Sequence, residues 1–255
     1  SSDGKTVAIG ANLNDGINGE TSGHVRVYTV DEIDGGNTSS VASWQQLGQD
    51  IDGEAAGDNA GVSISLSAIG RMVAIGAPYN NGTGEYSGHV RIYNRVGNEW
   101  EQIGHDIHGE NSGDIFGFSV SMSDDGTTIA VGALFNDDNG EHSGKVKVYR
   151  LGSGKNWSQI GQDLIGEAAG DRAGGSISLS GDGKSLAIGA VQNDSNGDAA
   201  GHVQLYRKAN GAWIPMGSEI VGDAHNDRFG KRLALSNDGH TLAVTAVGND
   251  AGGDN

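Results

Sequence analysis

Paired carboxylates in one short loop motif are the residues of this chain that could do chemistry. Glu54 and Asp58 lie four residues apart in the segment "DIDGEAAGD", next to glycines. Two carboxyl groups whose pKa values differ can act as the general acid and the general base of a hydrolysis. The motif recurs along the chain, and the full set of its acidic residues is Glu54, Asp58, Glu110, Asp114, Glu167, Asp171, Asp223 and Asp227.

This recurrence favours a structural role for the motif. A catalytic pair needs one tuned environment, whereas an aspartate that accepts backbone N–H groups is useful in every copy of a turn. We therefore interpret the loops as stabilised turns that together offer an acidic binding surface, and we expect no catalytic residue. The fingerprints G-x-S-x-G, H-E-x-x-H and the P-loop do not occur in the sequence.

A second group of polar loops has ligands that suit a hard cation. Asp137, Asn139 and Glu141 stand at i, i+2 and i+4, and the same spacing is found at Asp194, Asn196 and Asp198. Oxygen ligands of this kind bind calcium, although the missing glutamate at the twelfth position rules out an EF-hand. Calcium is thus a candidate ligand of both loops, and a solvated Asn/Asp/Gly turn is the alternative.

Histidines occupy one recurring position. His24, His89 and His202 each follow a glycine at the start of the phrase "GHVRVY" and its relatives, but Lys145 replaces histidine in the third copy. Because a lysine would not serve as the same metal ligand, we interpret these histidines as packing or hydrogen-bonding residues.

Composition narrows the class of protein. The 255 residues include 45 glycines, 2 prolines and no cysteine, and the formal net charge is -17. Such a charge repels nucleic acid and anionic membranes, and the lack of cysteine excludes disulfides and thiolate metal sites. No run of about 18 apolar residues is present, so the sequence predicts no membrane-spanning helix.

The elements that must position these loops follow from internal repeats. The segment "VAIGA" and its relatives end at Ala11, Ala77, Ala133, Ala190 and Ala246, with steps of 66, 56, 57 and 56 residues. Repeats of this length that are built from short strands indicate propeller blades.

Each full repeat has four runs with the period of a β-strand, which we name A to D. In run A at 117–123, Val120 and Met122 alternate with serines, and run B alternates bulky residues with alanine and glycine. Run C is the "GHVRVY" phrase, and run D begins at a tryptophan. We predict an all-β propeller of four-stranded antiparallel blades with run A nearest the axis.

The repeats resemble a known family. The segment "FGFSVSMSDDGTTIAVGA" at 116–133 is similar to an FG-GAP repeat of the integrin alpha-subunit propeller, and the phrasing is closer still to large surface proteins of marine bacteria and algae. The resemblance implies an extracellular propeller used for adhesion or scaffolding. The D-x-D-x-D-G calcium loop of integrins is missing between runs A and B.

The expected organisation is one propeller segment over residues 1–255. Its repeats are about 1–60, 61–116, 117–173 and 174–229, followed by a partial fifth at 230–255. Because five B runs accompany only four runs of each other type, ring closure is awkward, and we expect flanking repeats in a longer, larger propeller.

Alternating connections place the acidic loops of runs B–C and D–A on one face. We accordingly predict a non-enzymatic extracellular or cell-surface protein that binds a protein or glycan partner. The alternatives are a structural subunit of a surface filament or coat with homotypic contacts, and a propeller module attached to a polysaccharide-active enzyme. No nucleic-acid partner and no cofactor other than calcium are expected.

Overall fold

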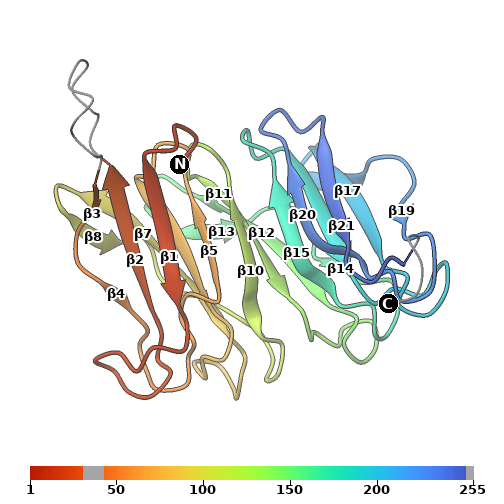
Figure 1. Cartoon of the computed structure of the whole chain (residues 1–255), viewed down its shortest axis with the longest axis horizontal. Helices are drawn as coiled ribbons and strands as arrows, with labels where there is room; N and C mark the ends of the chain where they lie inside the picture. Colours follow the sequence, from red (N-terminus) through yellow and green to blue (C-terminus); the bar gives the residue numbers. More distant parts are fainter. Residues whose placement is uncertain (31–42, 251–255) are drawn as a thin grey trace.

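The protein consists of antiparallel sheets set side by side. The structure, a computed structural model, describes residues 1–30 and 43–250, and the regular structure of these residues is entirely β. Five sheets follow one another along the chain, each made of consecutive strands (Figure 1). Within the same residues no helix could cross a membrane. The all-β propeller fold is therefore confirmed.

Each sheet is one blade. Blade 1 contains β1 (Thr6–Ala11), β2 (His24–Val30), β3 (Trp44–Gln46) and β4 (Ile51–Asp52). Blade 2 contains β5 (Ser63–Leu66), β6 (Met72–Ala77), β7 (His89–Val96), β8 (Glu99–Gln102) and β9 (Ile107–His108). Blade 3 contains β10 (Phe116–Met122), β11 (Thr128–Ala133), β12 (Lys145–Leu151), β13 (Trp157–Gln159) and β14 (Leu164–Ile165). Blade 4 contains β15 (Ala173–Leu179), β16 (Ser185–Ala190), β17 (His202–Ala209), β18 (Ala212–Pro215) and β19 (Ile220–Val221). Blade 5 consists of β20 (Phe229–Leu235) and β21 (Leu242–Ala246).

The A strands β5, β10, β15 and β20 lie innermost. Residues of all four strands or their flanks line one cavity of about 310 Å³. Serine hydroxyls join neighbouring A strands, since Ser63 donates to the carbonyl of Gly117 at 2.7 Å and Ser119 to that of Gly174 at 2.6 Å. Run A therefore lies nearest the axis, as predicted.

The small side chains of run B allow this close packing. A Cβ atom added to Gly132 would lie 2.2 Å from the carbonyl oxygen of Gly174 in the next blade. Gly174 itself has φ +85°, a conformation that glycine adopts without a steric penalty. The recurring glycines of runs A and B thus let one backbone approach the next.

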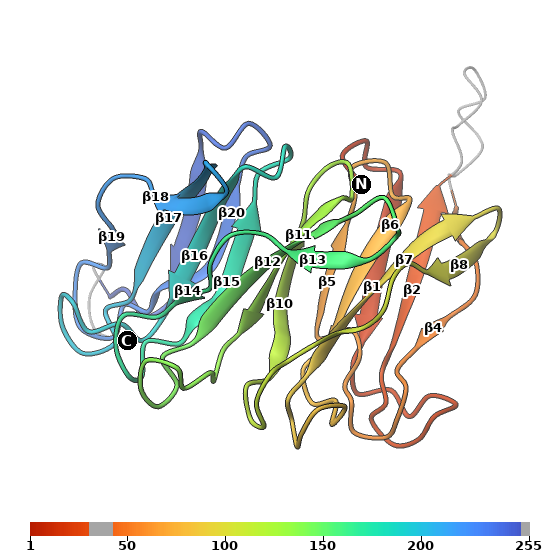
Figure 2. The ribbon, with the colours of Figure 1, turned by 180° about the vertical axis from the view of Figure 1, so that it is seen from behind.

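Run D differs from the expectation of a single strand. It forms two short strands that both pair with the C strand, such as β8 and β9 on β7, and Figure 2 shows β8, β13 and β18 from behind. The break falls at a glycine: Gly104 has φ +82°, and a Cβ there would lie 2.8 Å from Cδ1 of Trp157. The interruption therefore makes room for the tryptophan of the next blade.

The core lies between blades. Trp213 is 1% exposed, packs among residues of blades 3 and 4, and donates its indole N–H to the carbonyl of Ile160 at 3.2 Å. The indole N–H of Trp100 likewise donates to the carbonyl of Leu47 at 2.7 Å. Together with the equivalent bond of Trp157, these contacts fix the D strands of blades 2 to 4 against the preceding blade, whereas Trp44 of blade 1 is 51% exposed.

Candidate functional site

The loops expected on one face do lie together. The B–C and D–A connections are at the lower end of the molecule in Figure 1. Backbone hydrogen bonds link them within each blade: Gly113 donates to Glu85, Gly170 to Glu141, and Asn226 to Asp198. This end of the propeller therefore carries the repeated acidic residues.

The eight predicted acidic residues divide into two groups. Asp58, Asp114, Asp171 and Asp227 are buried, at 1–5% exposure. Each accepts a backbone N–H from three residues before it, for example Ala168 to Asp171 at 2.9 Å. These bonds agree with a turn-stabilising role. The other four, Glu54, Glu110, Glu167 and Asp223, are exposed, and a binding role for the acidic face stays a prediction.

The two candidate calcium loops use their polar atoms to hold the loops in place. Asp137 accepts the N–H of His142, and Asp194 that of Ala199, both at 2.7 Å. Asn139 and Asn196 donate to the carbonyls of the adjacent D–A loop. Glu141 and Asp198 are exposed, so three oxygen ligands do not converge through these bonds alone, and calcium binding stays a prediction.

A different cluster, formed between blades, has the geometry of a functional site. Glu167 lies in the loop after β14, His202 begins β17, and Glu219 precedes β19. One ligand atom of each residue lies within 4.8 Å of those of the other two. We call this group the blade-4 cluster.

The electrostatics of the blade-4 cluster are unusual. His202 is 5% exposed, and burial lowers the pKa of its imidazole. Its Nδ1 lies 3.4 Å from a carboxylate oxygen of Glu219 yet has no hydrogen-bond partner among the described residues. A hydrogen bond with Glu219, together with burial and the negative charge of that residue, raises the pKa of Glu167. The cluster thus holds a neutral imidazole beside two carboxyl groups that repel each other.

Blade 2 has an equivalent group, Glu54, His89 and Asp106, which we call the blade-2 cluster. Burial, followed by the charge of Arg91, lowers the pKa of His89 to about 4. Arg91 lies 3.3 Å from Glu54, so a guanidinium balances part of the negative charge.

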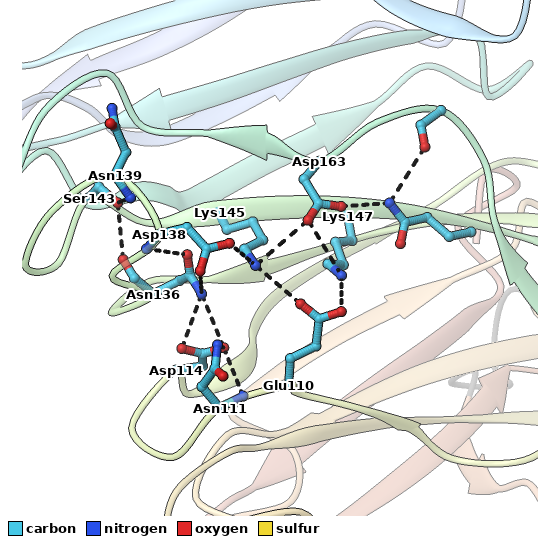
Figure 3. A network of polar contacts seen from close by, with 12 residues as sticks. Glu110, Asn111, Asp114, Asn136, Asp138, Asn139, Ser143, Lys145, Lys147 and Asp163 are labelled. Atoms are coloured by element: carbon cyan, nitrogen blue, oxygen red, sulfur yellow. Dashed lines mark hydrogen bonds and ion pairs between the residues drawn. The ribbon is translucent and has the colours of Figure 1, made fainter.

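In blade 3 the corresponding group is Glu110, Lys145 and Asp163, the blade-3 cluster (Figure 3). Nζ of Lys145 lies 3.2 Å from Glu110, 2.5 Å from Asp138 and 3.7 Å from Asp163. Lys147 also contacts Glu110 and lies 3.5 Å from Asp163. The lysines lower the pKa of Glu110, opposite to the shift of Glu167. This cluster is a closed network of ion pairs.

Three substitutions make blade 4 different. Gln204 stands where blades 1 to 3 have Arg26, Arg91 and Lys147. Pro215 replaces the glutamine that in the other blades donates to the D-strand aspartate, as Gln159 does to Asp163 at 2.6 Å. Glu219 replaces that aspartate with a longer side chain. The sequence carried this signal, but only the structure showed that Glu219 and Gln204 lie beside the same buried histidine.

The comparisons with known proteins agree with the fold. Residues 109–149 match the FG-GAP repeat family. No curated protein sequence matches the chain. Among solved structures, a protein from Bacteroides uniformis that is assigned as a 6-phosphogluconolactonase has a TM-score of 0.59 at 13% identity, over 94% of this chain and 60% of its own. The periplasmic gluconolactonase PpgL from Pseudomonas aeruginosa has a TM-score of 0.59 at 20% identity, over 96% and 62%.

These findings correct the functional expectation. The expectation of a non-enzymatic adhesion, scaffolding or coat protein is contradicted by the two structures described above, which match nearly the whole chain and are named as lactonases. The argument that every repeat offers the same acidic loop, and therefore no catalytic pair, also fails. The blade-4 cluster differs from its equivalents in blades 2 and 3. At these identities the similarity itself shows the fold, and the chain spans about 60% of the length of both neighbours. The chain is a β-propeller in which residues 109–149 form an FG-GAP repeat.

Proposed function

We propose that this propeller is the catalytic part of a hydrolase that opens lactones, with the blade-4 cluster as its active site. The observation that carries the proposal is the pairing of Glu167 with Glu219 beside the buried, unpartnered Nδ1 of His202. The names of the two structural neighbours supply the substrate class.

The chemistry of lactone opening needs the groups that this cluster offers. Water attacks the ester carbonyl, the bond from the acyl carbon to the ring oxygen breaks, and that oxygen leaves as a hydroxyl. A base must take a proton from the water and an acid must protonate the leaving oxygen. The hydrogen bond with Glu219 raises the pKa of Glu167, so this pair of carboxyl groups can hold a proton between them for transfer to the leaving oxygen.

Access and charge define the substrate more closely. Glu167 is exposed and Glu219 half-buried, whereas His202 lies behind them in the blade interface. Two carboxyl groups on an acidic face repel a phosphate-bearing ligand. We therefore propose an uncharged sugar lactone, such as glucono-1,5-lactone, in preference to a phosphorylated one.

Hydrolysis of glucono-1,5-lactone in a pH-stat tests this proposal, with the spontaneous rate subtracted. The 255-residue chain should exceed the spontaneous rate, and Glu167→Gln should lower kcat/KM by roughly 10²-fold, a common loss when a general acid or base is removed. Glu110→Gln, which removes the equivalent carboxylate of the blade-3 cluster, should leave kcat/KM unchanged. A rate equal to the spontaneous one, or equal losses in both variants, would refute the proposal.

We further propose an extracytoplasmic location, at the periplasm or the cell surface. The periplasmic neighbour and the FG-GAP repeat support it, and the acidic surface suits such a medium. In this proposal, the glycan partner expected from the sequence would be the source of the sugar lactone and not a docking partner. Fractionation of the source cells, followed by detection of the chain with an antibody, checks this location.

A further inference from the structure

The three interblade clusters differ in how they balance negative charge. In blade 3 the ammonium groups of Lys145 and Lys147 contact both carboxylates, and in blade 2 Arg91 contacts Glu54. In blade 4 the corresponding residue is Gln204, whose amide donates to the carbonyl of Leu205. Within residues 1–30 and 43–250, no lysine or arginine forms an ion pair with Glu167 or Glu219.

We propose that the blade-4 cluster binds a divalent transition-metal ion of the zinc class through Glu167, His202 and Glu219. The inference rests on the proposed function for the role of this site and deepens it. With the ion bound, Glu167 and Glu219 would serve as ionised ligands, and the ion would polarise the attacking water in place of the acid–base pair. Metal binding itself does not depend on that activity, because the ligands stand on their own geometry.

The buried imidazole is the first independent observation in favour of a ligand. His202 is 95% buried, and its Nδ1 lies 3.4 Å from Glu219 without a hydrogen-bond partner in the part of the chain that the structure describes. A buried polar atom without a partner costs free energy, so native structures rarely leave one unsatisfied. A metal ion would accept this lone pair and remove the repulsion between Glu167 and Glu219.

Distances and donor types agree with a metal of this class. Ligands about 2.0–2.1 Å from a tetrahedral zinc ion lie roughly 3.4 Å from one another. Nδ1 of His202 and Oε2 of Glu219 are 3.4 Å apart. A cavity of about 20 Å³ beside Glu167, His202 and Gln204 has room for one water or ion. One imidazole nitrogen with two carboxylate oxygens suits zinc, whereas calcium prefers oxygen alone.

Blade 3 supplies an internal analogue of the occupied site. Nζ of Lys145 contacts Glu110 and Asp163, the counterparts of Glu167 and Glu219 (Figure 3). The repeat therefore places a cation at this point of the interface, and in blade 3 the chain provides it. In blade 4, where His202 replaces that lysine and Gln204 replaces the second one, the cation must come from solution. In the sequence, Lys145 argued against a metal ion at the histidine positions. In the structure, the ammonium group of Lys145 lies where the metal ion of blade 4 is proposed, so this lysine supports a cation site at His202.

Calorimetric titration of the chelator-treated chain with Zn²⁺ tests the inference. One ion should bind per chain, and Co²⁺ in its place should give the visible absorption bands of a four- or five-coordinate site. His202→Lys should weaken Zn²⁺ binding more than roughly 100-fold, beyond the loss typical of an outer-shell change, because it removes a ligand and places its own ammonium in the cluster. Glu110→Gln should leave binding unchanged.

A gain of binding provides the second arm. Lys145→His combined with Lys147→Gln reproduces the blade-4 residues in blade 3, and it should raise the stoichiometry from one to two ions. Absence of Zn²⁺ binding in the wild-type chain, or binding that His202→Lys does not weaken, would overturn the inference. Zn²⁺ binding without lactone turnover would leave the inference standing and refute the proposed function, whereas lactone turnover by a chain that binds no Zn²⁺ in the titration would do the reverse.

Discussion

The blade-3 and blade-4 clusters occupy the same place in the repeat but have opposite electrostatics. In blade 3 two lysines lower the pKa of Glu110, whereas in blade 4 the neighbouring Glu219 raises the pKa of Glu167. The backbone is equivalent, since β12 and β17 pair with their neighbours in the same register. The difference shows that a few side chains convert a closed ion-pair network into a site that lacks a cation.

The largest expected effect comes from breaking the blade-3 network. Lys145→Met removes the ion-pair partner of Asp138 and one of the two ammonium groups that face Glu110 and Asp163. The free energy of unfolding should fall by about 3 kcal/mol, the lower end of the range for removing one partner of a buried pair, because the carboxylates are partly exposed. Urea denaturation followed by fluorescence measures it.

The control for this variant is Lys184→Met. Lys184 lies 3.4 Å from Asp182, and both side chains are mostly exposed, so its loss should change stability by less than about 0.5 kcal/mol. Equal losses in the two lysine variants would show that the blade-3 cluster is no more than a surface ion pair.

A smaller gain is expected when blade 4 is given the residue of blade 3. His202→Lys should raise the free energy of unfolding at neutral pH by about 1 kcal/mol, because an ammonium then bonds to Glu167 and Glu219. The gain is limited since Ser195 stands in place of Asp138. Thermal unfolding in the presence of a chelator measures it without bound metal.

The matched variant for this gain is His89→Lys in blade 2. Arg91 already faces Glu54 there, so a second cation brings repulsion and should not stabilise the chain. A gain in blade 2 as large as that in blade 4 would contradict the proposed difference in charge balance.

The two glutamates should also respond oppositely to pH. The pKa of Glu110 is lowered in the folded protein, so its stabilising contribution is present above the ordinary carboxyl pKa and is lost as the pH falls through the lowered value. The pKa of Glu167 is raised, so its contribution is present at low pH and is lost as the pH rises through the raised value.

Comparison of the wild type with Glu110→Gln and Glu167→Gln between about pH 3 and pH 8 checks these signs. The stability difference between wild type and variant should increase with pH for Glu110 and decrease with pH for Glu167. Parallel profiles would mean that the two clusters are balanced alike.

The smallest effect is expected from calcium, because its candidate loops are alike in blades 3 and 4. Asp137 and Asp194 hold their loops through equivalent backbone hydrogen bonds. A dissociation constant of about 10⁻³ M is typical of weak extracellular sites, so ~1 mM calcium should stabilise the chain by about 0.4 kcal/mol per occupied loop. Asp137→Asn and Asp194→Asn should each halve the calorimetric stoichiometry. Submicromolar affinity would show that the loops bind calcium more tightly than their ligands indicate.

Much of the fold could be predicted from the sequence. The steps of 56 and 57 residues, the alternation of run A and the small residues of run B led to antiparallel blades with run A innermost. The break in run D was missed, although Gly104 lies at the break, because the space that it leaves for Trp157 belongs to another blade.

The candidate site was less predictable. Glu167 was named for its place in a repeated loop, and His202 was set aside as a packing residue because Lys145 stands at its position in blade 3. Glu219 was not considered, although it departs from the aspartate of the other repeats. Gln204, Pro215 and Glu219 all differ from the residues at the equivalent positions of the other repeats, and this shared difference is the sequence signal for the site.

The sequence by itself determined the strands, the blades and the face on which the acidic loops gather. Strand alternation and turn residues act over a few neighbouring positions, so they can be read along the chain. Only the tertiary structure decided that Glu167 of one blade meets His202 and Glu219 of the next, and that Nδ1 of the buried imidazole has no hydrogen-bond partner among residues 1–30 and 43–250. The physical reason is that burial and charge balance depend on every group facing a site, and these groups come from segments separated by up to about 50 residues of chain.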